Sequence, residues 1–207
     1  MSIATVNPAT GETLEEFDPH PPEEVDRRIG LAHEAFGVLR DTTFGQRAEW
    51  MRIAADMLEA DTDTLAGTMT TEMGKTLAAA KAEIAKCAKG MRFYAERAEE
   101  FLAPRRLDDP SVVGASQAYV HYQPLGPILA VMPWNFPCWQ VIRFAAPALM
   151  AGNTGLLKHA SNVPRTALYL DTLFERAGFP AGAFSTLLVG SDAVEAVLSD
   201  PRVVAAT

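Results

Sequence analysis

Two side chains in the stretch from 124 to 161 have the residue types for chemistry on an anion. Asn135 carries a neutral amide whose NH₂ group can point at a developing oxyanion, and a preorganised donor of this kind contributes roughly 3 kcal/mol. Arg143 follows eight residues later in an otherwise apolar segment, where its guanidinium needs an anionic partner. These residues are candidates for oxyanion stabilisation and for carboxylate binding.

Each candidate also has a purely structural interpretation. Asn135 could satisfy its own backbone in a turn, and Arg143 could form an internal ion pair with an aspartate or a glutamate. Trp134 could be a packed indole, and Lys158 could be a solvated surface lysine. The residues alone leave these alternatives open.

The elements that carry these residues are two successive units of strand and helix. Residues 128–132 form a continuous apolar run between two prolines, which is typical of a strand buried on both faces of a parallel sheet. Pro137 then favours a helix that runs to about residue 150. A turn at 152–155, a strand at 155–158 and a helix at 164–177 repeat the pattern. Ligands bind at the carboxyl ends of such strands, so we expect two corners that face a ligand.

The motifs at these corners resemble a known family. PWNFP at 133–137, GNTGLLKHAS at 152–161 and the proline at 164 are similar to the cofactor-binding domain of the aldehyde dehydrogenase superfamily. The context of Trp139, Gln140, Val141 and Arg143 resembles the bacterial succinate-semialdehyde dehydrogenases of that superfamily. The resemblance covers the whole chain, but only the first half or so of the family's length.

The resemblance implies a role for each residue of the two corners. Asn135 would be the oxyanion donor for the thiohemiacetal, and Trp134 would line the nicotinamide side of the same corner. Lys158 would contact the adenosine ribose or its phosphate. The second corner would continue under the ribose through His159, Ala160 and Ser161.

Ser161 favours NADP as the cofactor, with NAD as the second choice. Family members that prefer NAD often carry a glutamate three residues after the lysine, where it binds the ribose hydroxyls and would repel the 2′-phosphate of NADP. A serine at this position removes the charge and leaves room for the phosphate.

The same resemblance implies a substrate and a missing nucleophile. Arg143 matches the arginine that clamps the substrate carboxylate, so the expected substrate is an aldehyde that carries a carboxylate, namely succinate semialdehyde. Cys138 lies in the motif, but the family's nucleophilic cysteine and general-base glutamate lie later, in segments that this sequence does not contain. We therefore expect Cys138 to line the substrate tunnel or to fill the core, and the 207 residues alone to be inactive.

The rest of the chain predicts an α/β fold, with an amino-terminal helical segment and a partial doubly wound parallel sheet. Residues 1–110 predict a hairpin at 3–17 and packing helices up to about residue 101, with breaks near 41–45, 61 and 73–75. Gly74, Lys75 and Thr76 suggest a phosphate loop, but Met69 stands where that motif requires glycine, so we expect Gly74 to end a helix.

The carboxyl-terminal half divides into an arm and a partial Rossmann-like domain. Residues 111–123 end in a pattern typical of an exposed strand, which the resemblance assigns to an oligomerisation arm. Residues 124–207 form the partial Rossmann-like domain, with further strands expected at 184–189 and 203–206 and a helix at 193–198.

Composition limits the class of protein. A hydrophobic content of 48% can supply a sizeable core, and a formal charge of -8 argues against a nucleic-acid-binding surface. The two cysteines have no metal spacing, and no apolar run approaches about 20 residues, so we expect a cytoplasmic protein with no metal site and no membrane span. The full-length protein is expected to be a homo-oligomer. Two alternatives stay open: a non-catalytic nucleotide-binding or oligomerisation module, and a structural remnant.

Overall fold

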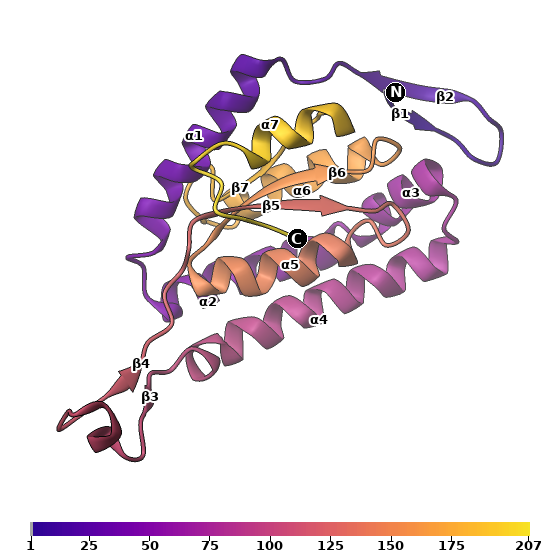
Figure 1. Cartoon of the computed structure of the whole chain (residues 1–207). Coiled ribbons are helices and arrows are strands. Elements are labelled where there is room, and N and C mark those ends of the chain that lie inside the picture. The colour runs from indigo at the N-terminus through magenta and orange to yellow at the C-terminus, as the bar shows by residue number, and fades with distance from the viewer. Residues whose placement is uncertain (1) are drawn as a thin grey trace.

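A parallel four-stranded sheet lies at the centre of the molecule (Figure 1). The computed structural model describes residues 2–207, and its central strands are β5 (Pro127–Met132), β6 (Thr154–His159), β7 (Phe184–Thr186) and β8 (Ala205–Ala206). The order across the sheet is β7-β6-β5-β8, and each neighbouring pair is parallel. The chain adds two strands on one side of β5 and then crosses to the other side. This reversal is the switch point of a doubly wound sheet.

Helices cover both faces of the sheet (Figure 1). On one face lie α1 and α7, and on the other lie α5 and α6, with α2, α3 and α4 packed behind them. The helices are α1 (Pro22–Leu39), α2 (Phe44–Ala60), α3 (Thr62–Met73), α4 (Leu77–Phe101), α5 (Trp139–Ala151), α6 (Pro164–Arg176) and α7 (Val194–Leu198), with 3-10 helices at Pro110–Val113 and Ser191–Ala193.

The alternation of side chains along the strands gives the sheet two buried faces. Leu129 and Leu156 belong to the core that contains residues of α1 and α7. Their neighbours Ala130 and Leu157 belong to the larger core that contains residues of α2 to α6. Successive strand residues point to opposite faces, so the continuous apolar runs in the sequence are those of a sheet covered on both sides. The predicted α/β fold with a partial doubly wound sheet is confirmed.

Local signals determine where the amino-terminal helices begin and end. Thr43 and Gln46 form a capping box at the start of α2, in which each side chain accepts a hydrogen bond from the other residue's main-chain N–H. Gly74 follows α3 with a φ of 77°, a left-handed conformation that glycine adopts without strain. The predicted breaks and the helix-terminating role of Gly74 are confirmed.

The amino-terminal hairpin is also confirmed. Strand β1 (Ile3–Val6) pairs antiparallel with β2 (Thr13–Phe17). Three residues of β1 are buried, whereas β2 is largely exposed. The hairpin therefore packs on α3 and α6 through β1 and presents β2 to solvent.

Residues 104–123 form an arm that extends away from the body of the molecule (Figure 1). Within it, β3 (Arg105–Arg106) pairs antiparallel with β4 (Tyr119–Val120). The strand predicted at the end of 111–123 is thus only two residues long, because a 3-10 helix and Gly114, at a φ of 68°, precede it. The role of this arm in oligomerisation stays a prediction.

Several predicted boundaries are wrong by two or three residues. Helix α5 begins at Trp139 and not at Pro137, because the residues between 135 and 138 form turns. Strand β7 ends at Thr186 and not at 189, and β8 begins at Ala205 and not at 203. The ends of these strands are determined by hydrogen bonds to the neighbouring strand, which a local sequence pattern does not contain.

Candidate functional site

The two predicted corners meet in one cavity at the carboxyl edge of the sheet. Strands β5 and β6 run in register, with Met132 opposite His159, so the residues that follow them emerge side by side. The cavity, of about 470 Å³, is lined by Trp134, Lys158, Ala160, Ser161, Asn162, Gly190, Ser191 and Asp192. The sequence predicts a cofactor contact for four of these residues, namely Trp134, Lys158, Ala160 and Ser161. The remaining four were not predicted.

This cavity offers a cation, hydroxyl groups and an aromatic surface to a ligand. Lys158 forms no ion pair with any residue in the described range 2–207. Trp134 is 49% exposed, and Ser191 is also exposed. The lining also contains the carboxylate of Asp192. An ammonium next to hydroxyl groups suits a ribose phosphate.

Asn135 lies beside Trp134 with an exposed side chain. Its main-chain oxygen accepts a hydrogen bond from Lys75 Nζ at 2.9 Å. Within the part of the chain that the structure describes, no group forms a hydrogen bond with the Asn135 side-chain amide. The geometry therefore leaves this amide available as a donor and does not support the interpretation in which it satisfies its own turn.

The corner after β5 is held from the helical layer behind α5. The side chain of Glu83 is 2% exposed, and its Oε1 accepts hydrogen bonds from the N–H groups of Cys138 and Trp139 at 3.0 and 2.9 Å. Its Oε2 forms an ion pair with Lys75, whose Nζ also lies 3.9 Å from the centroid of the Phe136 ring. A carboxylate at a helix N-terminus satisfies unpaired N–H groups and complements the helix dipole. The pair therefore fixes the main chain of this corner.

His159 lies buried beneath the cavity and does not line it. The N–H of Ala160 donates to His159 Nδ1 at 2.9 Å, and this Nδ1 also lies 3.2 Å from Met132 O, while Nε2 lies 2.9 Å from Pro137 O. Burial lowers the pKa of His159, in keeping with a neutral ring. The imidazole thus ties the corner after β6 to the corner after β5. The side-chain geometry gives no support to a contact between His159 and the ribose.

Arg143 lies in a second cavity, of about 490 Å³, between α5 and β8. Gln140, Phe144 and Thr207 are among its lining residues, and none of its described lining residues is shared with the first cavity. The guanidinium is exposed, and it forms no ion pair with any residue between 2 and 207, so the internal ion pair is not formed there. Trp139, one turn before Arg143 on α5, packs against α4.

Cys138 is a core residue. Its side chain is fully buried, and its Sγ lies 3.7 Å from Met69 Sδ. Burial raises the pKa of the Cys138 thiol well above its usual value, so the thiol does not ionise near neutral pH. The geometry favours the core-filling interpretation over a nucleophile.

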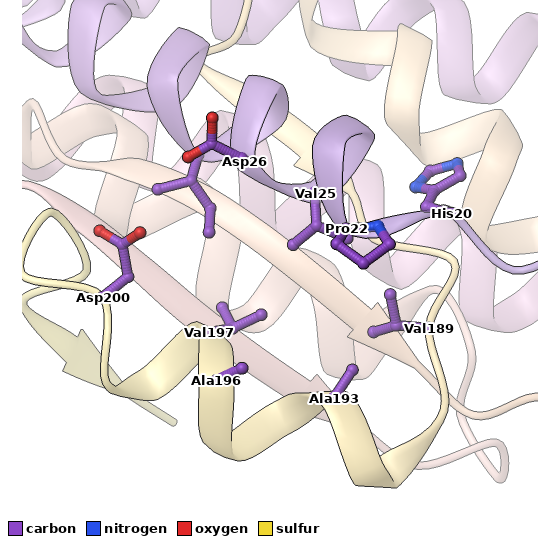
Figure 2. Close-up of a pocket in the computed structure, with 10 residues that line it drawn as sticks. His20, Pro22, Val25, Asp26, Val189, Ala193, Ala196, Val197 and Asp200 are labelled. Atoms are coloured by element: carbon purple, nitrogen blue, oxygen red, sulfur yellow. The ribbon is translucent and has the colours of Figure 1, made fainter.

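A third cavity, of about 260 Å³, lies between α1 and α7 (Figure 2). Its walls are mostly apolar, and Val25 and Val197 face each other across it (Figure 2). Asp26 and Asp200 both lie within 2.6 Å of Arg202 Nη2, so their charges are already paired. None of the predicted site residues is among the described residues that line this groove.

Within residues 2–207, no group of three or more His, Cys, Asp or Glu residues is placed to hold a metal ion. No helix in the same range is both long enough and apolar enough to cross a membrane.

The comparison with protein families decides the relationship of the chain. Residues 1–207 match the sequence model of the aldehyde dehydrogenase family. The chain belongs to this family. Among curated relatives, succinate-semialdehyde dehydrogenase (NADP(+)) 1 of Mycobacterium tuberculosis is 64% identical over 207 residues, and the Mycobacterium leprae succinate-semialdehyde dehydrogenase (NADP(+)) is 59% identical over 210. Each match covers 100% of this aldehyde dehydrogenase chain and 45% of the relative.

Solved structures show the same partial coverage. Succinic semialdehyde dehydrogenase from Streptococcus pyogenes, in complex with NADP+, superposes with a TM-score of 0.93 at 36% identity, over 99% of this chain and 44% of that one. A structure of Gox0499 superposes with a TM-score of 0.95 at 38% identity, over 100% and 44% of the two chains. This aldehyde dehydrogenase chain thus spans less than half the length of the relatives that it matches.

Besides Asn162, which directly follows Ser161, two groups of residues in this aldehyde dehydrogenase chain escaped the sequence analysis. Gly190, Ser191 and Asp192 line the cavity because they follow β7, and the rule that ligands bind beyond strand ends would have found them if applied to this third unit. Glu83 lies on the buried face of α4 between Ala80 and Cys87. A carboxylate at helical spacing on an apolar face is the signal that points to a buried partner.

Proposed function

We propose that this chain supplies the cofactor corner and the oxyanion donor of an NADP-dependent aldehyde dehydrogenase that oxidises succinate semialdehyde to succinate. The observation that carries the proposal is the single cavity in which Trp134, Lys158 and Ser161 meet at the carboxyl edge of the sheet. The names of the Mycobacterium tuberculosis and Streptococcus pyogenes relatives support the choice of cofactor and substrate.

Lys158 and Ser161 would hold the ribose and the 2′-phosphate of the cofactor, and Trp134 would line its nicotinamide side. A cavity of about 470 Å³ with an unpaired ammonium among the described residues fits such a group. When bound, NADP supplies the hydride acceptor for the oxidation. Ser161 adds no charge that would repel the 2′-phosphate, so NADP should bind more tightly than NAD, which lacks this phosphate.

Asn135 would donate a hydrogen bond to the substrate oxygen as negative charge develops on it, a contribution of roughly 3 kcal/mol from a preorganised donor. The support is its exposed amide and the main-chain hydrogen bond from Lys75 that fixes its position. Arg143 would bind the substrate carboxylate, because its exposed guanidinium suits bidentate binding. We expect the nucleophile and the general base to come from segments outside these 207 residues.

We also propose that the full-length protein is a cytoplasmic homo-oligomer. Both cysteines are free and buried, which suits a reducing compartment. The arm at 104–123 exposes apolar side chains, and such a surface is suited to a contact with a second copy. These exposed side chains include Val112, Val113, Tyr119 and Tyr122.

Equilibrium binding of NADP to the 207-residue chain, followed by tryptophan fluorescence, tests the cofactor role, and an assay with succinate semialdehyde runs beside it. We expect saturable binding, a loss of at least about tenfold in affinity for Lys158→Ala, and no turnover. Lys81→Ala is the matched control, because Lys81 pairs with Asp63 on an exposed surface outside the cavity. Absence of saturable binding would overturn the cofactor role. Turnover by the chain alone would overturn our placement of the nucleophile.

A further inference from the structure

The corner after β6 is tied to the amino-terminal hairpin by three consecutive residues of β1. The N–H of Ala4 donates a hydrogen bond to Ser161 O at 3.1 Å. Ile3 is 3% exposed and lines a small space together with Ser161, so its side chain packs beneath the corner. The hydroxyl of Thr5, also fully buried, donates to Glu72 Oε1 at 3.0 Å. The hairpin therefore contacts both the corner and a buried carboxylate.

Glu72 extends this connection from β1 to α6. Its Oε1 also accepts a hydrogen bond from Arg165 N at 2.6 Å, and its Oε2 accepts from the N–H and the hydroxyl of Thr166 at 3.0 and 2.6 Å. Glu72 is 2% exposed, and no cation in the described residues pairs with it. These donors belong to the first turn of α6, which begins at Pro164, three residues after Ser161. Glu72 therefore anchors the helix that follows the corner.

The short segment between β6 and α6 is consequently fixed at both ends. Ala4 holds it at Ser161, and Glu72 holds it at Arg165 and Thr166. Hydrogen bonds weaken steeply when the angle at the hydrogen falls below about 120°. The affinity for a 2′-phosphate bound at this corner would therefore depend on the position of the corner. NAD has no phosphate there, so its affinity would depend less on that position.

We propose that β1 and Glu72 are positioning elements of the cofactor site, and that they set the preference for NADP over NAD by fixing the Ser161 corner. This inference rests on the proposed function. Neither Thr5 nor Glu72 is among the described residues that line the cavity, so both act through the corner. A merely structural role would lower the stability of the chain and leave the ratio of the two affinities unchanged.

Thr5→Val tests the inference because valine keeps the shape of threonine and removes only the hydroxyl donor to Glu72. Thr154→Val is the matched control: Thr154 is equally buried, and its hydroxyl donates to Ala32 O at 2.9 Å, at the opposite end of β6. Isothermal titration with NADP and with NAD gives both affinities. We expect Thr5→Val to weaken NADP binding about three- to tenfold and NAD binding by less than about twofold. Thr154→Val should leave the ratio unchanged.

Thr166→Val supplies a second variant, because it removes a hydroxyl from the same carboxylate at α6 and should shift the ratio in the same direction. Native-state hydrogen exchange adds a measurement without cofactor: the amides of residues 160–163, 165 and 166 should exchange faster in Thr5→Val and not in Thr154→Val. If Thr5→Val left the ratio of the NADP and NAD affinities unchanged, the inference would be overturned, and the proposed function would still stand. If the parent chain bound neither cofactor, the proposed function would fail and the inference with it.

Discussion

Lys75→Met tests whether a buried ion pair holds the corner that carries Asn135. Methionine keeps an unbranched side chain of nearly the same length and removes the ammonium. Glu83, whose side chain is 2% exposed, would then keep its two hydrogen bonds from main-chain N–H groups and lose its ionic partner. Removing one partner of a buried pair costs about 3–5 kcal/mol. Because the Lys75 side chain is 10% exposed and water reaches the pair, we expect a loss near the lower limit, about 3 kcal/mol in the free energy of unfolding.

Glu83→Gln separates the ion pair from the helix cap. The glutamine oxygen can still accept the N–H groups that Glu83 Oε1 accepts at the start of α5, while the charge opposite Lys75 is lost. Lys75 keeps Asn135 O as an acceptor, so this loss should be smaller, about 1–2 kcal/mol. The two residues act as a unit, and the double variant should therefore lose about 1–2 kcal/mol less than the sum of the single losses.

Urea unfolding followed by far-ultraviolet circular dichroism measures these free energies. Lys81→Met is the control, because Lys81 and Asp63 are 44% and 86% exposed in their side chains and such a pair contributes less than about 1 kcal/mol. A loss for Lys75→Met no larger than that of Lys81→Met, or strictly additive losses in the double variant, would refute the reasoning.

The remaining predictions concern the cofactor lysine, the thiols and the buried histidine. The loss of NADP affinity in Lys158→Ala should shrink as salt is raised in the titration, since the contact is ionic; a salt-independent loss would contradict a phosphate contact. Burial raises the pKa of both Cys87 and Cys138, so a thiol reagent such as DTNB should label the chain only after urea is added; rapid labelling of the folded chain would contradict this. Burial lowers the pKa of His159 below 6.5, so the unfolded chain takes up this proton first as the pH falls, and stability should decline from about pH 7 to pH 5.5. Urea unfolding at both pH values should show a smaller decline in the free energy of unfolding for His159→Gln than for the parent chain. An equal decline would contradict the role of His159.

The two corners could be predicted from the sequence because their signals are local. An apolar run that ends at Pro133, followed by Trp134 and Asn135, contains both the strand and its carboxyl end. Two adjacent units of this kind place their corners at one edge of a parallel sheet, and the cavity that contains Trp134 and Lys158 confirms this arrangement.

The supports of the corners could not be predicted because they depend on tertiary packing. Glu72 and Glu83 contact residues more than fifty positions away, and no local pattern pairs a carboxylate with a distant helix N-terminus. The environment of Arg143 depends on β8, which lies next to α5 only in the folded sheet. The position of His159 is a different case: successive strand residues point to opposite sides, so Lys158 and His159 should not have been assigned to the same surface.

A crystal structure of the 207-residue chain with NADP bound is the most direct test of the account. The account predicts the 2′-phosphate within hydrogen-bonding distance of Lys158 Nζ, with the ribose against Ala160 and Ser161 in the cavity at the carboxyl edge of the sheet. Density for NADP in the apolar groove between α1 and α7, or a 2′-phosphate directed away from Lys158, would contradict it.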